Sequence, residues 1–346
     1  MILVTGGAGY IGSHTLIALH TEGYEFIVYD NLCNSSLESI KRVSKIIEKE
    51  IIFEEGDIRD THRLKDIFGK YNINSVIHFA GLKAVGESVQ NPLKYYDNNL
   101  NGTLSLLKVM QEFNCKKVVF SSSATVYNEV DSDNFKPLDE NNPTGKTTNP
   151  YGTSKYMIEQ ILQDLYISDN NWKIVILRYF NPVGAHESGT IGEDPNGIPE
   201  NLMPFIAQVA VGKRKYLNVF GNDYNTKDGT GVRDYIHVVD LSNAHVKAIK
   251  YLDKMSKEGN MPPLIVNIGT GIGYSVLDMI QTYEKVNKIK IPYKIVSRRD
   301  GDIAKYYANP SFAQKILDWK ATKTLEQMCE DSYRWQKNNP NGYNEK

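Results

Sequence analysis

The chain opens with Met1-Ile-Leu-Val-Thr-Gly-Gly-Ala-Gly-Tyr-Ile-Gly12, a short apolar run that passes directly into a glycine-rich turn. Gly6, Gly9 and Gly12 have the spacing at which glycine allows positive φ and lets backbone N–H groups approach a pyrophosphate. The turn leads into Ile11 to Glu22, where apolar residues recur with helical period, so a bound phosphate would lie at the positive end of a helix. This stretch therefore predicts the strand, turn and helix that begin a dinucleotide-binding α/β fold.

A second strand is predicted from Glu25 to Asp30, and Asp30 follows Gly12 by 18 residues. At that distance a carboxylate at the strand end would accept hydrogen bonds from the ribose hydroxyls of adenosine, which favours NAD over NADP. The alternative is that Asp30 is a turn or capping residue. The glycine turn in register with it makes the cofactor interpretation the stronger one.

Short β-branched and aromatic runs alternate with longer segments of helical period through the first half of the chain. Further strands are predicted at Ile51 to Glu55, Ser75 to Ala80, Lys117 to Ser121 and Lys173 to Tyr179, and helices at Pro92 to Asn114 and Pro150 to Tyr166. This alternation predicts an α/β protein with a Rossmann-type doubly wound parallel sheet. Asn149 before Pro150 marks a helix start, with Asn as the cap and Pro in the first turn.

The composition of the sequence changes after Tyr179. Residues 181–204 hold many glycines and prolines, and a long irregular segment inside a folded protein is usually functional. We expect residues 1–180 to form an NAD-binding domain and residues 181–346 to form mainly a smaller α/β substrate-binding domain. Leu264 to Ile268 is predicted to return to the first sheet, and C-terminal helices are predicted from Ser275 and Thr324.

Composition excludes several classes of protein. The 346 residues carry 40 Lys and Arg against 41 Asp and Glu, so no excess charge points to nucleic acid or to an anionic membrane. No run approaches the ~20 apolar residues that cross a bilayer, and the N-terminus does not resemble a secretion signal. Three cysteines, Cys33, Cys115 and Cys329, form no pair or cluster of metal-binding spacing. We expect a cytoplasmic protein with reduced thiols and no metal.

Tyr151 and Lys155 lie four residues apart on the helix that Asn149 caps, so both side chains project from one face. A nearby ammonium favours the phenolate form of a tyrosine, as would the positive nicotinamide of NAD, which makes Tyr151 a candidate general acid and base. Such pairs are also common on surface helices. The weight of this pair comes from its neighbours in the predicted fold.

Ser121-Ser-Ser-Ala-Thr125 follows the fifth predicted strand, so hydroxyls would emerge at the same sheet edge as the glycine turn. A serine hydroxyl beside the tyrosine could hold a substrate oxygen and relay its proton. At least one of these serines could instead satisfy the backbone of its own turn.

Longer strings carry a more specific signal. They are His78-Phe-Ala-Gly-Leu-Lys-Ala-Val-Gly-Glu-Ser88, Arg178-Tyr-Phe-Asn-Pro-Val-Gly-Ala-His186 and Asp228-Gly-Thr-Gly-Val-Arg-Asp-Tyr-Ile-His237. With the glycine turn, Ser123 and Tyr151-x-x-x-Lys155, they resemble the UDP-glucose 4-epimerase family of the extended short-chain dehydrogenase/reductases, and the resemblance covers nearly the whole chain. It implies reversible interconversion of UDP-galactose and UDP-glucose through transient oxidation at C4 with tightly bound NAD.

The resemblance also implies roles for individual residues. Tyr151, Lys155 and Ser123 match the catalytic positions. Besides these three, the predicted NAD site comprises Gly6, Gly9, Tyr10, Ile11, Gly12, Asp30, Asn31, Leu32, Cys33, Asn34, Ser35, Asp57, Ile58, Phe79, Ala80, Gly81, Leu82, Lys83, Asn98 and Phe180. The nucleotide-sugar positions are Asn181, Asn201, Leu202, Asn218, Val219, Phe220, Arg233, Arg299, Asp302 and Tyr306.

Residue chemistry supports part of that assignment. Arg233 and Arg299 offer paired donors for a diphosphate, although either could instead pair with Asp234 or Asp300. A bulky residue at Tyr306 resembles the members restricted to UDP-glucose and UDP-galactose, whereas a small one admits N-acetylated sugars.

One residue departs from the family pattern. Asn128 stands where the family usually has glycine, so a positive φ would rest on a residue that tolerates it less well.

Two other functions and the assembly stay open on the sequence. A nucleotide-sugar 4,6-dehydratase would need an acid and a base beside Thr125, where Ala124 and Val126 stand instead. A protein that only senses NAD would be expected to lose Tyr151 or Lys155. The helices predicted at 92–114 and 150–166 could pair in a homodimer, as the resemblance implies, or turn their apolar faces to the core.

Overall fold

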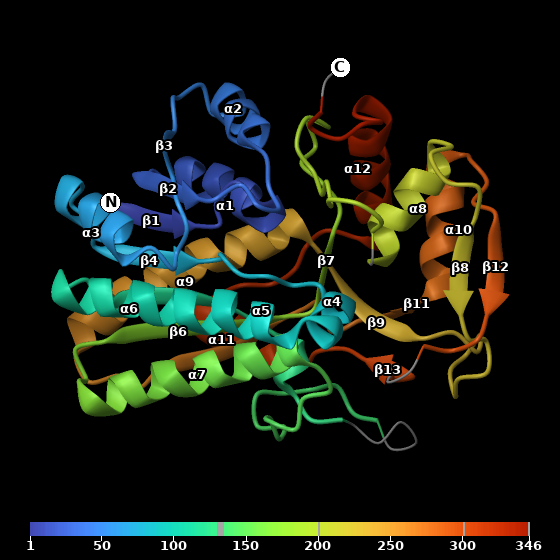
Figure 1. The fold of residues 1–346 in the computed structure, drawn as a ribbon. Helices are drawn as coiled ribbons and strands as arrows, with labels where there is room; N and C mark the ends of the chain where they lie inside the picture. The colour runs from blue at the N-terminus through green and yellow to red at the C-terminus, as the bar shows by residue number, and fades with distance from the viewer. Residues whose placement is uncertain (130–134, 200, 300–301, 345–346) are drawn as a thin grey trace.

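The computed structural model describes residues 1–129, 135–199, 201–299 and 302–344 (Figure 1). Its main sheet comprises β1 (Ile2–Thr5), β2 (Phe26–Asp30), β3 (Ile52–Glu55), β4 (Ser75–His78), β5 (Lys117–Ser123), β6 (Lys173–Tyr179) and β10 (Leu264–Ile268). The strand order is β10-β6-β5-β4-β1-β2-β3, and all neighbours pair in parallel. The predicted doubly wound α/β fold is confirmed.

The strand order reverses between β1 and β4. From β1 the sheet extends through β2 and β3 on one side, and through β4, β5 and β6 on the other. Thr5 and His78, the last residues of β1 and β4, lie opposite each other in the ladder. Ligands of open α/β sheets bind beyond the carboxyl ends of the strands at such a reversal. The glycine turn and the residues after His78 therefore stand at the expected site.

Helices cover both faces of this sheet. One apolar core includes α1 (Tyr10–Thr21), α2 (Leu37–Ile46), α9 (Val238–Glu258) and α11 (Ser311–Leu317), and the other includes α3 (Thr61–Lys70), α6 (Gly102–Glu112) and α7 (Pro150–Ser168). Figure 1 shows α6 and α7 along one face and α9 beyond the sheet. Because all residues of β1, β2, β4 and β6 are buried, these strands appear in the sequence as continuous apolar runs rather than alternating ones.

A second group of elements lies at the right of Figure 1. It contains a four-stranded sheet of β7 (Asn181–Val183), β9 (Val232–His237), β11 (Gly273–Ser275) and β13 (Lys305–Tyr306), a parallel pair of β8 (Leu217–Phe220) and β12 (Tyr293–Val296), and the helices α8 (Leu202–Ala210), α10 (Val276–Asn287) and α12 (Leu325–Asn338). Their apolar residues form a separate core. Ser275 and Thr324 cap α10 and α12 with capping boxes, at the predicted starts.

The segment predicted as helical from Pro92 to Asn114 is interrupted. Helix α4 (Val85–Gln90) precedes α5 (Pro92–Tyr96), a π-helical turn at Asp97–Asn101 and then α6. The wider turn buries Asn98 and Asn99, and Asn99 bonds to the backbone of Leu82. A hydrophobic period cannot reveal such a turn, because the insertion is set by polar contacts with a distant loop.

Residues after position 180 complete the main sheet. The expected return of Leu264 to Ile268 is confirmed by β10, which pairs with β6. Helix α9 also packs on α1, so a second late segment belongs to the same core. None of the described helices has the length and apolar composition that crossing a membrane requires.

Candidate active site

Glycine is required in this turn because neighbouring backbone atoms leave no room for a side chain. Gly6 has φ of 71°, and a Cβ there would lie 2.6 Å from the backbone nitrogen of Ala80. A Cβ on Gly12 would lie 2.5 Å from the carbonyl oxygen of Gly6. Gly9 is the N-cap of α1, and within the described chain no side chain caps that helix. The N–H groups of its first turn therefore face the sheet edge, an arrangement that fits a diphosphate.

Asp30 is compatible with both roles considered from the sequence, that of a turn residue and that of a ribose-binding carboxylate. It is 8% exposed, and its carboxylate accepts hydrogen bonds from the backbone N–H groups of Ala8 and Leu32 at 3.0 and 2.9 Å, and from the Ser35 hydroxyl at 2.8 Å. Burial raises the pKa of Asp30, and these bonds oppose the rise. The carboxylate thus orders the glycine turn and the next loop while standing at the strand end where a ribose would bind.

Other predicted cofactor residues gather at the same edge. The Asn31 amide donates to Asp57 at 2.9 Å, and Arg59 beside that carboxyl holds the pKa of Asp57 well below its usual range. Ile58 is buried in the core rather than exposed, so its side chain supports the site from below. Leu82 is held on both backbone groups by Asn99. Among the remaining predicted residues, Cys33, Asn34, Gly81 and Lys83 are exposed.

The three candidate catalytic residues meet where β5 ends. Asn149 caps α7 by accepting from the Gly152 N–H at 2.9 Å, as predicted. Tyr151 and Lys155 are both buried, and the Lys155 Nζ donates to the Ser121 carbonyl at 2.7 Å while lying 5.9 Å from the centre of the Tyr151 ring. The nearby Ser123 hydroxyl acts to lower the pKa of Tyr151.

Burial controls the titration of both candidate groups. It lowers the pKa of Lys155 to about 8, although the negative charge of Glu159 acts in the opposite direction. It raises the pKa of Tyr151, opposed by the hydrogen bond from Ser123. The prediction that the Lys155 ammonium and the positive nicotinamide of NAD favour the phenolate concerns the cofactor-bound protein and stays a prediction.

Tyr306 belongs to the second group of elements and borders the candidate site. Its hydroxyl donates to the Ala124 carbonyl at 2.6 Å, and its ring centre lies 5.8 Å from that of Phe180. Both aromatic rings contribute to a small apolar cluster beside Ser123. Asn181 donates to the Asp234 carbonyl oxygen at 3.1 Å.

The two candidate diphosphate-binding arginines have different surroundings. Arg233 pairs with Asp302 at 3.4 Å, and Arg299 lies 3.8 Å from the centre of the Phe220 ring. The Asp234 carboxylate binds backbone groups around Thr270 and Ala308 instead of either arginine. Asp300, the other alternative partner, lies outside the described residues.

Two residues at this site were not predicted. The Glu193 carboxylate pairs with Lys83 at 3.1 Å and accepts from Asn201 at 3.3 Å, so it joins a predicted cofactor residue to a predicted substrate residue. The position of Glu193 within the long irregular segment was its only signal in the sequence. Asn99 carried no signal beyond its place next to Asn98.

Some predicted substrate residues turn their side chains toward the second core. Val219 is buried in the second core, and Leu202 packs against that core at the start of α8. Asn218 and Phe220, which flank Val219 on β8, are half-buried. Alternation along a strand explains this pattern, since Val219 faces opposite to its neighbours.

The concern about Asn128 is not supported. Asn128 is not among the described residues with positive φ, whereas Gly145 has φ of 102°. The Asn128 N–H donates to Pro143, and its side chain accepts from the Lys146 N–H at 2.7 Å. The left-handed residue of this turn is therefore Gly145, and Asn128 stabilises it with a side chain that glycine lacks.

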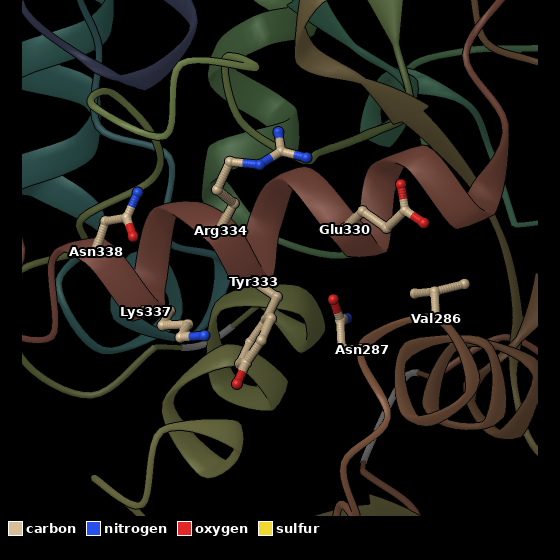
Figure 2. A pocket seen from close by; sticks show the side chains of 7 residues that line it. All are labelled: Val286, Asn287, Glu330, Tyr333, Arg334, Lys337 and Asn338. Carbon is tan, nitrogen blue, oxygen red and sulfur yellow. The ribbon is translucent and has the colours of Figure 1, made fainter.

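A surface cavity of about 310 Å³ lies apart from these residues (Figure 2). It is bordered by the end of α10 and by side chains of α12, including Glu330, Arg334 and Lys337. None of its lining residues belongs to the predicted site. In the described part of the chain, no group of three His, Cys, Asp or Glu side chains is placed to hold a metal ion.

Comparison with known proteins decides the family. A family model described as GDP-mannose 4,6 dehydratase matches residues 3–332. The UDP-glucose 4-epimerases of Bacillus subtilis and Homo sapiens are each 56% identical to this chain, over 99% of it and 98% of their own length. The chain belongs to the UDP-glucose 4-epimerase family. The resemblance identified from the sequence is confirmed.

A solved structure of the same family has the same fold. The UDP-glucose 4-epimerase of Bifidobacterium longum, in complex with NAD+ and UDP, aligns with a TM-score of 0.93 and 55% identity over 99% of each chain. The wider family model is named after a dehydratase, but this epimerase-family chain has Ala124 and Val126 on either side of Thr125. The carboxylates expected of a dehydratase are not at these positions.

Proposed function

We propose that this chain interconverts UDP-galactose and UDP-glucose, with NAD as a tightly held cofactor. The proposal is carried by the convergence of Ser123, Tyr151 and Lys155 at the sheet edge that also bears the glycine turn. Membership of the epimerase family and the NAD and UDP bound by the Bifidobacterium longum relative support it.

The residues present fit NAD. Gly6, Gly9 and Gly12 would face the diphosphate, Asp30 the adenosine ribose, and the residues from Phe79 to Lys83 the nicotinamide half. A Cβ on Gly6 or Gly12 would clash with nearby backbone atoms, which accounts for glycine at both positions. When bound, NAD would supply the hydride acceptor for C4 of the hexose and, once reduced, the hydride donor for the opposite face of the 4-keto sugar.

Proton transfer falls to Tyr151. Its phenol would exchange a proton with the 4-hydroxyl of the sugar, while Ser123 would hold the same oxygen and share the proton path. Because burial holds the pKa of Tyr151 high, proton uptake from the sugar needs positive charge beside the phenol, and Lys155 supplies one such charge. Lys155 would also hold the nicotinamide ribose.

Epimerisation requires the substrate to be held firmly at one end only. Arg233 and Arg299 would bind the diphosphate, with Asn181, Asn201, Leu202, Asp302 and the β8 residues around the nucleotide sugar. The hexose would then be free to turn over beside Tyr306. The hydrogen bond from Tyr306 to Ala124 fixes the wall of that space and supports selection against N-acetylated sugars.

Assembly and location are part of the proposal. Leu93 and Ile167 are 81% and 80% exposed, and Val89 is 61% exposed, on α4, α5 and α7, which pack side by side. Exposed apolar side chains on neighbouring helices are typical of a protein interface, so we expect a homodimer through these helices. All three cysteines are free, which supports a cytoplasmic location.

The direct test is to incubate the purified protein with UDP-galactose without adding NAD. UDP-glucose should form with no net rise in the absorbance of reduced nicotinamide, because the hydride returns in each cycle. Loss of water to a 4-keto-6-deoxy sugar would favour the dehydratase. Tight NAD binding without turnover of any nucleotide sugar would favour the sensor. Either result would overturn the proposal.

A further inference from the structure

Three consecutive serines at the end of β5 contact three residues on one face of α7. The Ser121 carbonyl accepts from the Lys155 Nζ at 2.7 Å, and the Ser122 hydroxyl donates to the Glu159 Oε1 at 2.5 Å. The nearby Ser123 hydroxyl acts to lower the pKa of Tyr151. Residues 151, 155 and 159 are spaced by four, so they lie along one helix face. Glu159 therefore extends the candidate catalytic pair by one helical turn.

Glu159 is held from the sheet as well as from its own helix. It is 0% exposed, and the Arg178 guanidinium on β6 donates to both of its oxygens, the shortest contact being 2.6 Å. Arg178 lies opposite Ser122 in the β5·β6 ladder. Two cross-strand neighbours thus converge on one buried carboxylate, directly beneath the serines of the site.

A buried ion pair is not in itself a stabilising feature. Removing two charges from water costs several kcal/mol per ion, and replacement by apolar residues of similar volume is often neutral or favourable. The placement of Glu159 calls for a reason besides stability, and its distance of one turn from Lys155 suggests one.

The charged and titratable groups around Lys155 come from several elements. Tyr151 and Glu159 lie on α7, His78 on β4, and Arg178 and Tyr179 on β6. Burial lowers the pKa of His78 to about 3, so this neighbour is neutral, and burial raises the pKa of Tyr179. Of these groups, Glu159 is the one whose charge raises the pKa of Lys155. Glu159 therefore opposes the loss of the Lys155 proton that burial promotes.

We propose that Glu159 is a positioning residue, which places a carboxylate one helical turn from Lys155 and, through Ser122, holds the end of β5 in register for proton transfer by Tyr151. Its role in the reaction rests on the proposed function. The charge of Glu159 acts on the Lys155 ammonium. The hydrogen bond that Glu159 accepts from Ser122 positions the end of β5. These two contributions can be separated by substitution.

The charge is tested with the double variant Glu159→Gln/Arg178→Gln, which removes both charges and leaves neither buried alone. Lysines carrying ¹³C at Cε would be titrated by NMR in the NAD-bound protein, with Lys155→Met identifying the Lys155 signal. We expect the Lys155 titration to move to lower pH than in the unmodified protein. The alkaline limb of kcat should move with it while KM changes little. An unchanged Lys155 titration would overturn the proposal, whether or not the enzyme is active.

The register is tested with Ser122→Ala, which removes one hydrogen bond and keeps the ion pair. We expect kcat to fall several-fold with the alkaline limb in place. The control is Asp331→Asn, a buried carboxylate on α12 that binds His237 and Arg334. It should lower the melting temperature and leave the Lys155 titration unchanged. A lowered melting temperature with normal kcat in Ser122→Ala would show that the hydrogen bond from Ser122 to Glu159 contributes to stability and not to catalysis. Activity of the unmodified protein toward UDP-galactose tests the proposed function separately.

Discussion

The hydroxyl of Tyr306 on β13 donates to the carbonyl oxygen of Ala124, which immediately follows Ser123 at the end of β5. This bond joins the second group of elements to the sheet edge that carries the catalytic candidates. It also fixes one wall of the proposed hexose site at the position where the serine hydroxyl would hold the substrate.

Shortening that wall should change selectivity. In Tyr306→Ala we expect kcat/KM for UDP-N-acetylglucosamine to rise at least tenfold relative to that for UDP-glucose, because the ring no longer fills the space beside Phe180. Tyr306→Phe is the matched control, since it removes the bond to Ala124 and keeps the ring. Equal selectivity of the unmodified protein and Tyr306→Ala would show that another residue forms the wall.

Loss of the Tyr151 hydroxyl should stop turnover without releasing NAD. Positioned acid–base groups contribute roughly 10²- to 10⁴-fold to rates, so kcat of Tyr151→Phe should fall within that range. Bound NAD, measured after denaturing the purified variant, should match the unmodified protein. Near-normal kcat would exclude Tyr151 as the proton-transfer group.

A side chain at Gly12 should prevent cofactor binding. A Cβ there would meet the Gly6 carbonyl at 2.5 Å and deform the turn, so we expect Gly12→Ala to be purified largely without NAD. The matched control is Gly69→Ala in α3, where the nearest atom to an added Cβ is 3.9 Å away. That variant should retain NAD and gain up to about 1 kcal/mol of stability from helix propensity. Full NAD content in Gly12→Ala would show that NAD binding does not require glycine at residue 12.

Buried histidines should make the protein sensitive to acid. His78 is 2% exposed between the hydroxyls of Thr5 and Thr103, and burial lowers its pKa to about 3. The unfolded chain takes up a proton below pH ~6.5 and the folded chain does not, so stability present above that pH is lost as pH falls toward 3.

The difference in unfolding free energy between pH 7 and pH 4 should therefore shrink by about 3 kcal/mol in His78→Asn, measured by urea unfolding. The exposed His62→Asn is the control and should leave that difference unchanged. An equal pH dependence in both variants would place the acid sensitivity elsewhere.

The proposed dimer can be broken at its most exposed apolar residues. Leu93→Asp with Ile167→Asp should halve the molar mass measured by light scattering, because two charges would be buried at the interface. Ile295→Asp is the control, since Ile295 is 48% exposed on β12. A monomeric unmodified protein would refute the interface.

Local sequence patterns predicted the sheet well. Strand β1 lies in the apolar run before the glycine turn, as predicted. Strands β6 and β10 have the predicted bounds, and the other strands of the sheet differ by at most two residues at either end. These strands are short apolar runs between clear turn signals, and Asn149, Ser275 and Thr324 cap their helices through contacts within three residues. The domain boundary near residue 180 stays a prediction.

Features set by distant contacts were not predictable in this way. The partners of Glu159, Glu193 and Asn99 come from other strands or loops, and nothing in their own neighbourhood marks them. The same holds for the raised pKa of Tyr151, since burial depends on the whole fold. Asn128 was misjudged because the positive φ of its turn falls on Gly145, 17 residues later.

The position of β10 at the edge of the main sheet has a consequence for synthesis on the ribosome. Strand β6 lacks this neighbour, and α1 lacks the cover of α9, until residue 268 has been translated. At roughly 5 to 20 residues per second, the nascent chain carries an open strand edge for several seconds after β6 is made. Translation speed between residues 180 and 268, and chaperones that shield strand edges, should therefore influence the yield of folded enzyme.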